Sequence, residues 1–335
     1  MIVFLLIVAF AVILVGCELF VNGIEWFGRK LNLGEGVVGS VLAAVGTALP
    51  ETVIPLIAIL FSEGDAGNEI GIGAILGAPF MLATLAMFMC GLSVVIFSMT
   101  GKRERTLRFN KTIMRRDLSF FLVAYAIAVL AGILDIGNFR YVVAVGLIVG
   151  YGAYVRQTAK TEGDLEGECR PLFFHRRADS PQLKLVILQI IVALAAIIFG
   201  ADLFVTELTK AAEALKVPAL IVSLLITPFA TELPEKFNSV MWMGQKKDTL
   251  ALGNITGAMV FQSTFPVAIG MAFTDWRLWG NNDWHATVAA GVALFAGILL
   301  YGRLRLTKKG LSVGSLLFGG VLYLAFVVAT IWSIL

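Results

Sequence analysis

Apolar segments recur along the whole chain, separated by short polar stretches, and most are close to the roughly 20 residues that a helix needs to cross a bilayer. This period of apolar and polar stretches predicts an all-α membrane protein with ten spanning helices. The predicted spans lie near residues 1–24, 35–62, 70–98, 118–134, 139–156, 184–206, 217–243, 249–274, 285–302 and 312–334.

The longest polar stretch, Gln157 to Gln182, divides these spans into two sets of five. We therefore expect an N-terminal five-helix half over 1–156, a polar connector over 157–183 and a C-terminal five-helix half over 184–335. The composition agrees with a membrane protein, since 59% of the residues are hydrophobic and only 15% are charged.

Three short motifs of the first half return in the second half at almost constant spacing. The pairs are GCELFV at 16–21 with GADLFV at 200–205, TALPE at 47–51 with TELPE at 231–235, and GAILGA at 73–78 with GNITGA at 253–258. The offset is 184 residues for two pairs and 180 for the third. Because each half has an odd number of spans, the second half is expected to be inverted. Inverted repeats are a feature of secondary transporters, which bind substrate near the bilayer midplane.

Basic residues are distributed very unequally between alternate loops. Of the Lys and Arg residues, 21 lie on one side and four on the other, and only Lys236 falls within a span. Because translocation disfavours positive charge, both termini are predicted outside and the connector in the cytoplasm. The membrane is then the plasma membrane, the inner membrane of a bacterium or archaeon. Glu18 and Asp202 lie near the ends of predicted spans, where an interfacial position is expected.

Two carboxylates, Glu51 and Glu235, fall well inside predicted spans at equivalent positions of the repeat. A charge there costs on the order of 3 kcal/mol or more, which favours a functional role. Pairing with a nearby base, or permanent protonation, is the structural alternative. Pro50 and Pro234 directly precede the two glutamates. A proline inside a helix frees a backbone carbonyl, which is tolerated at membrane depth where it lines a cavity or binds an ion.

Two ionised glutamates facing each other in a dry site would repel, so a divalent cation or protons must share the place. Calcium takes about six to eight oxygen ligands, of which Glu51 and Glu235 could supply up to four. Thr47 and Thr231 precede the glutamates by four residues and would share their helical face. We therefore predict Glu51 and Glu235 as metal ligands.

The glycine-rich motifs do not indicate a nucleotide site. A phosphate-binding fingerprint needs a preceding strand, whereas 73–78 and 253–258 lie in apolar spans, where close helix packing is the better interpretation. No organic cofactor is implied. The sequence also lacks the paired aspartates or the Ser/His arrangement of an intramembrane hydrolase. We therefore do not expect this protein to be an enzyme.

The motifs resemble the two α-repeats of the cation/calcium exchanger superfamily, most closely its prokaryotic sodium/calcium exchanger-like branch with ten helices. The family pattern G-T-S-x-P-E is similar to GTALPE at 46–51 and ATELPE at 230–235, and G-N-x-x-G-S-N resembles GAILGAP at 73–79 and GNITGAM at 253–259. In that family the paired glutamates bind calcium between the halves and sodium competes with it. The resemblance therefore implies this role for Glu51 and Glu235, with Thr47 and Thr231 matching the family threonines.

Several expected sodium ligands are replaced. The serine after each threonine is Ala48 or Glu232, the serine of the second element is Ala78 or Ala258, and the polar residue four positions later is Leu82 or Gln262. Glu232 adds a third carboxylate that could carry a proton. Lys236 could neutralise Glu232 or another carboxylate, or extend into a cavity. These replacements favour proton coupling over sodium coupling, or a changed metal preference.

The sequence thus predicts a secondary active antiporter that exchanges a divalent cation, calcium first of all, for H+ or Na+ by alternating access. An exchanger of the same fold that selects Mg2+, Mn2+ or Na+, or an ion sensor that does not transport, is the alternative. Inorganic cations and the lipid bilayer are the expected partners. The net charge of +3 reports topology rather than nucleic-acid binding, and the oligomeric state is left open.

Overall fold

The computed structural model describes residues 2–48, 51–52, 55–56, 59, 65–160, 169–176, 180–214, 232–278, 284–306 and 311–334. These residues form helices and contain no β-strand. The α-helices are α1 (Ile2–Lys30), α2 (Glu35–Val37), α3 (Ala44–Thr47), α5 (Asp65–Met81), α6 (Met87–Met99), α7 (Lys111–Ile133), α8 (Phe139–Ala159), α9 (Leu183–Ala214), α12 (Leu233–Gly244), α13 (Asp248–Gln262), α14 (Phe265–Phe273), α15 (Trp284–Leu306) and α16 (Val313–Ile334). Two π-helical turns, Val38–Ala43 and Leu82–Ala86, and a 3-10 turn, Phe173–His175, complete them.

Eight helical segments of the described chain are long and apolar enough to cross a membrane. This confirms the predicted all-helical membrane protein. The two other predicted spans, 35–62 and 217–243, carry the glutamates and include residues outside the described part, so the number of ten stays a prediction. The division into two halves and a connector also stays a prediction.

Helices extend beyond the apolar runs that predict them. α1 continues to Lys30 and α9 to Ala214, because polar residues can prolong a helix past the hydrocarbon core. Glu18 and Asp202 consequently lie within α1 and α9 rather than near their ends, while their interfacial position stays a prediction.

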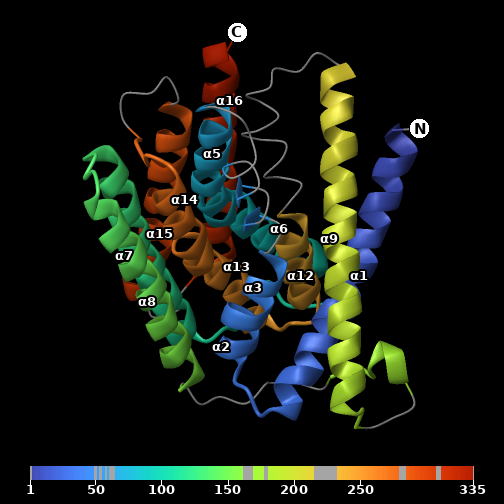
Figure 1. Cartoon of the computed structure of the whole chain (residues 1–335). Helices are drawn as coiled ribbons and strands as arrows, with labels where there is room; N and C mark the ends of the chain where they lie inside the picture. Colours follow the sequence, from blue (N-terminus) through green and yellow to red (C-terminus); the bar gives the residue numbers. More distant parts are fainter. Residues whose placement is uncertain are drawn as a thin grey trace.

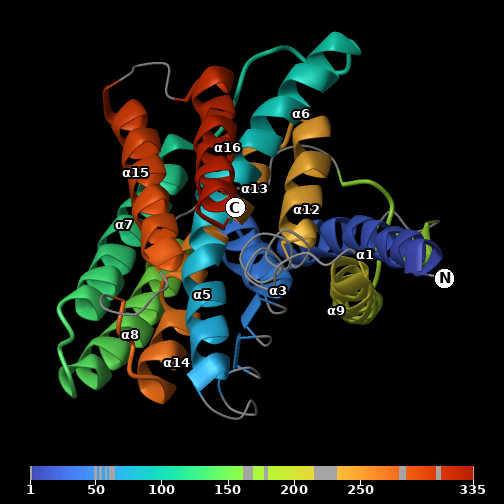
Figure 2. The same cartoon turned by 90° about the horizontal axis from the view of Figure 1, so that it is seen from above.

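The long helices α1 and α9 run antiparallel and pack along each other at one side of the molecule (Figures 1 and 2). Two of their close contacts are reciprocal. A Cβ atom on Gly16 would lie 2.9 Å from Cγ1 of Ile197, and one on Gly200 would lie 2.9 Å from Cγ1 of Ile13. Both glycines and both isoleucines are separated by the repeat offset of 184 residues. A two-fold relation between α1 and α9 produces this pattern, and the inverted repeat of the complete halves remains a prediction.

Helix α13 forms the centre of the packed core, and all its residues are buried. It contacts α12, α7 and the π-helical turn Val38–Ala43. Gly257 makes this approach possible, because a Cβ atom there would lie 2.1 Å from the carbonyl oxygen of Ser40. The predicted close packing therefore holds for GNITGA. For GAILGA it stays a prediction, because the repeat equivalents of Gly39 and Ser40, residues 223–224, lie outside the described residues.

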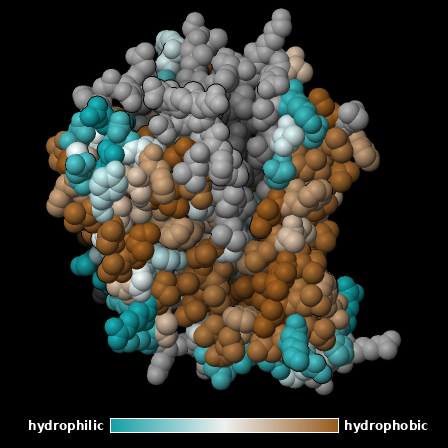
Figure 3. Space-filling view, viewed as in Figure 1, coloured by the Kyte–Doolittle hydropathy of each residue, from teal (hydrophilic) through white to brown (hydrophobic). Residues whose placement is uncertain are grey.

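Apolar side chains cover much of the face seen in Figure 3, with hydrophilic residues toward its two ends. Large side chains such as Phe4, Val145 and Trp332 are exposed. A soluble protein rarely exposes so much apolar surface, whereas a bilayer favours it. Both termini lie at the same end of the molecule in Figure 1, and their orientation in the membrane stays a prediction.

Candidate ion-binding site

The two glutamates selected from the sequence are both buried. Glu51 lies in a helical stretch after α3 and is 6% exposed, and Glu235 lies in the first turn of α12 and is 1% exposed. Pro234 occupies the same first turn, where a helix needs no N–H donor. The expected proline within a helix is therefore wrong for Pro234, because α12 begins at Leu233. The N-terminal end of α12 favours the negative charge of Glu235.

A third carboxylate and a lysine share this buried region. Glu232 is the N-cap residue of α12, and its Oε2 atom lies 3.0 Å from Nζ of Lys236. The side chains are 1% and 0% exposed. Of the roles considered for Lys236, the structure shows the pairing with Glu232.

The charges of these residues act on one another. Glu51 interacts electrostatically with Glu235, Glu232 and Lys236. Because the lysine ammonium balances the Glu232 carboxylate, the net charge of the ionised cluster is the sum of the charges of Glu51 and Glu235. One divalent cation would neutralise this net charge, whereas one monovalent cation would leave a buried negative charge.

The remaining predicted ligands differ in what the structure says of them. Thr47 is buried at the end of α3, and its contact with the glutamates stays a prediction. The Thr47 hydroxyl donates to the Ala43 carbonyl at 2.9 Å, so its oxygen can still offer a lone pair to a cation. Gln262 is buried at the end of α13, and its contact with the glutamates stays a prediction. Thr231 lies outside the described residues.

Several buried side-chain atoms have no hydrogen-bond partner within the described protein. They are, among others, both carboxylate oxygens of Glu51 and of Glu235, Oε1 of Glu232, Oε1 of Gln262, Oδ1 of Asn254 and both amide atoms of Asn238. Such atoms are rare, because burying a polar group without a partner costs free energy. Carboxylate and amide oxygens are the ligands that calcium prefers. The site therefore fits a cation shared by the two glutamates.

Asn254 and Asn238 were not predicted as site residues. The Asn254 amide donates to the Glu235 carbonyl at 3.1 Å and to the Ser239 hydroxyl at 3.1 Å, which fixes the first turns of α12 against α13. The sequence signal that could have identified Asn254 is its place in the G-N-x-x-G element. Asn238 lies three residues after Glu235, on the same face of α12, and the sequence alone gives it no distinguishing mark.

The polar side chains are divided unequally between the halves. At the repeat offsets, Glu232 corresponds to Ala48, Lys236 to Thr52, Asn254 to Ala74 and Gln262 to Leu82. The first half therefore contributes Thr47 and Glu51, while α12 and α13 carry most of the other polar groups. Among the described residues, no group of three or more His, Cys, Asp and Glu is arranged to hold a metal ion. A cation here would need amide, hydroxyl or backbone oxygens as well as carboxylates.

A buried carboxylate outside the candidate site, Asp117 in α7, holds the surrounding helices together. It accepts hydrogen bonds from Ser40 at 2.6 Å, Tyr154 at 3.0 Å and Thr256 at 2.9 Å. These partners come from the first π-helical turn, α8 and α13. Asp117 therefore fixes the position of α13, which carries Asn254, and its hydrogen bonds make it a structural residue.

Two further ion pairs hold the turn between α12 and α13. Glu25 accepts from the Trp242 indole at 2.7 Å and pairs with Lys247. Arg103 binds both oxygens of Asp248, at 2.7 and 2.8 Å. Their charges are compensated, so neither Glu25 nor Asp248 is a candidate ligand for a transported cation.

A polar cavity of about 440 Å³ lies beside α1, and its lining includes Glu18, Asn22, Lys102 and Arg170. Cys17 is adjacent to Glu18 in the chain, and its thiol lies 3.9 Å from the Pro234 carbonyl, next to Glu235. The described lining of the cavity includes none of the candidate ion ligands.

The family model described as sodium/calcium exchanger protein matches residues 1–157 and 185–335. The uncharacterized membrane protein MJ0091 of Methanocaldococcus jannaschii is 25% identical over 320 residues, covering 95% of this chain and 93% of the relative. A candidate antiporter, CaxA of Alkalimonas amylolytica, is 25% identical over 296 residues, covering 85% and 86%. The inner membrane protein YrbG of Escherichia coli is 23% identical over 330 residues, covering 94% and 93%.

The fold matches solved structures of the sodium-calcium exchanger NCX_Mj. One, soaked with Na+ and Sr2+, superposes with a TM-score of 0.75 at 22% identity, covering 98% of this chain and 99% of that one. Another, soaked with Na+ and Ca2+, gives a TM-score of 0.75 at 21% identity, covering 98% and 97%.

Proposed function

Since the chain belongs to the sodium/calcium exchanger protein family, we propose that it is a secondary active antiporter that exchanges a divalent cation for H+ or Na+ by alternating access. Calcium is the first candidate, and Glu51 and Glu235 are its shared ligands. The observation that carries the proposal is the set of buried carboxylate oxygens that have no partner in the described protein. The family consists of transporters, so the proposal includes no enzymatic reaction and no organic cofactor.

Charge balance supports a divalent cargo. The Glu232–Lys236 pair is neutral when both groups are ionised, which leaves the charges of Glu51 and Glu235 to be balanced. In the apolar surroundings of the core, a cation that leaves a net charge would bind less favourably.

Protons are the proposed coupling ions. Two carboxylates that release a divalent cation can remain neutral by taking up two protons, which needs no further oxygen ligands. Sodium would need a complete oxygen shell, and Ala48, Ala78 and Ala258 offer no side-chain oxygens where the related family has serines. Glu232 supplies an additional proton acceptor.

The unequal division of ligands favours one alternative within the same class. Because the first half offers few oxygens besides those of Thr47 and Glu51, a smaller cation with fewer protein ligands, Mg2+ or Mn2+, could replace calcium. Alternating access is part of the proposal because secondary transporters bind substrate near the midplane, between repeats that open to one side at a time.

Calcium uptake into proteoliposomes tests the proposal. Radioactive calcium is added outside, and uptake is driven in parallel by an outward proton gradient and by an outward sodium gradient. We expect uptake with the proton gradient, and loss of uptake in Glu51→Gln and in Glu235→Gln. Glu104→Gln, which changes an exposed carboxylate paired with Arg108, is the matched control and should transport normally.

The outcomes separate the alternatives. Uptake with sodium alone would overturn proton coupling while keeping the site. Normal uptake in both glutamate variants would overturn the site. Binding of calcium without flux under either gradient would indicate a sensor, and competition by Mg2+ or Mn2+ without calcium flux would indicate a changed cargo.

A further inference from the structure

A groove between α15 and α16 is separate from the ion site and faces the surrounding lipid. Its volume is about 480 Å³, within the range of small-molecule sites, and Ala83 and Met87 form its floor. Phe295, Leu299 and Phe318 line it and are 50%, 37% and 44% exposed. The groove therefore opens at the outer surface of the helix bundle.

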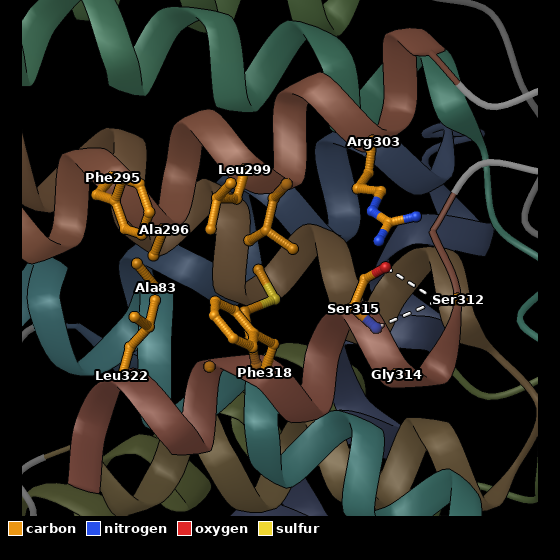
Figure 4. A pocket seen from close by; sticks show the side chains of 13 residues that line it. Ala83, Phe295, Ala296, Leu299, Arg303, Ser312, Gly314, Ser315, Phe318 and Leu322 are labelled. Atoms are coloured by element: carbon orange, nitrogen blue, oxygen red, sulfur yellow. Dashed lines mark hydrogen bonds between the residues drawn. The ribbon is translucent and has the colours of Figure 1, made fainter. Parts of the chain in front are cut away.

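The two ends of this groove differ in polarity, as Figure 4 shows. Phe295, Ala296, Leu322 and Ala83 form the apolar end. At the other end Arg303, on the last turns of α15, lies across from Ser315, on the first turn of α16. An apolar channel with a cation at one end matches a molecule with a hydrocarbon chain and an anionic head.

Hydrogen-bonding groups add to the polar end. The Ser312 and Ser315 hydroxyls lie 2.9 Å apart, and the Ser315 N–H donates to Ser312 Oγ. A Cβ atom on Gly314 would meet only Ser312 Oγ, at 3.8 Å, so this glycine leaves space rather than serving tight packing. The partial positive charge at the beginning of α16 acts in the same direction as Arg303.

The depth of the groove fits a phospholipid. Arg303 follows the predicted span 285–302 directly, which places it at the level of the headgroups, while Phe295 and Leu299 lie within the span. The distribution of basic residues predicts this end of α15 to be cytoplasmic, where anionic lipids attract basic residues. We propose that this groove binds an anionic phospholipid of the cytoplasmic leaflet, with the phosphate at Arg303 and an acyl chain along Leu299 and Phe295.

Arg305 provides a matched control on the same turn of α15. It has the same charge and lies two residues away, near the same membrane level, but it does not line the groove. A general attraction between a basic surface and anionic lipid would involve both arginines equally. Specific lipid binding in the groove would depend on Arg303 and not on Arg305.

Lipid titration of the purified protein, followed by native mass spectrometry, tests the proposal with phosphatidylglycerol and phosphatidylcholine as probes. We expect preferential retention of one phosphatidylglycerol. Arg303→Gln should weaken this binding about fivefold, the effect of one basic residue at an anionic lipid surface, and Arg305→Gln should leave it unchanged. Gly314→Leu should also weaken binding, because its side chain would enter the groove.

Equal retention of both lipids would overturn the proposal, as would equal losses in the two arginine variants. Unchanged binding in both Arg303→Gln and Gly314→Leu would place any bound lipid elsewhere. The thermal unfolding midpoint without added lipid shows that each variant is folded, so that weaker binding reports the groove.

Discussion

The Lys236 ammonium lies 3.0 Å from the Glu232 carboxylate, one helical turn away, and both side chains are buried within the region that contains Glu51 and Glu235. A buried ion pair adds little stability compared with apolar residues, but removing one partner leaves a buried charge. Each partner of the pair is therefore needed so that the other is not a buried charge without compensation.

Lys236→Met should destabilise the protein by about 3–5 kcal/mol, because it leaves Glu232 without its counter-charge. The double variant Glu232→Gln/Lys236→Met should recover much of this loss. Thermal unfolding in detergent measures both. A double variant no more stable than Lys236→Met would show that the pairing is not the cause.

Glu232→Gln should change the pH dependence of calcium uptake. With one proton-accepting group fewer in the site, protons compete less well with calcium, so the acidic limb of the profile should move to lower pH. Initial rates between pH 5 and 9 would measure this shift, with exposed Glu104→Gln as the control. An unchanged profile would remove Glu232 from the coupling mechanism.

Gly257→Ala should destabilise the core by at least about 1–3 kcal/mol, because its Cβ atom would collide with the Ser40 carbonyl. Gly291→Ala is the matched control: it is a helical glycine whose Cβ would meet no described atom within 4 Å, and higher helix propensity should keep or raise stability. Similar melting midpoints for the two variants would contradict the close packing of α13.

Asp117→Ala should lower the free energy of unfolding by about 3 kcal/mol or more, because three hydroxyl groups lose a charged acceptor at once. Tyr154→Phe removes one of these bonds and should cost about 1.5–3 kcal/mol. Thermal unfolding of the two variants tests this order. A larger effect of Tyr154→Phe would show that Asp117 is not the centre of the network.

The native thiol of Cys169 can report the predicted orientation. Burial, and secondarily the charge of Glu25, raise the pKa of Cys169 above its usual value, so labelling by an impermeant maleimide should be slow at pH 7 and faster at pH 9. Cys17 and Cys90 are buried, and Cys169→Ser should therefore abolish the signal. Labelling of sealed, right-side-out vesicles from outside would contradict a cytoplasmic connector.

Much of this architecture follows from short sequence signals. The apolar runs locate the long helices, and the repeated motifs point to Glu51 and Glu235, which are indeed buried. The same motifs place Gly16 and Gly200 at equivalent positions, where the structure has them in equivalent contacts.

Other features depend on three-dimensional neighbours that a linear pattern does not contain. Asp117 lies beside Arg115 and Arg116 at the edge of a predicted span, where it resembles a loop residue. It pairs with Arg116, yet it also accepts hydrogen bonds from three distant segments. The partner of Lys236 depends on where α12 begins, which is decided by Pro234 in the first turn rather than by hydrophobicity.

The reciprocal fit of α1 and α9, in which Gly16 receives Ile197 and Gly200 receives Ile13, looks the same from either face of the bilayer. Such a crossing has no built-in polarity, and by itself it would serve import and export equally well. In the proposed antiporter the electrochemical gradients set the direction of net flux in every case. The unequal halves, in which Glu232, Lys236 and Asn254 correspond to Ala48, Thr52 and Ala74, can change only how affinities and rates differ between the two faces.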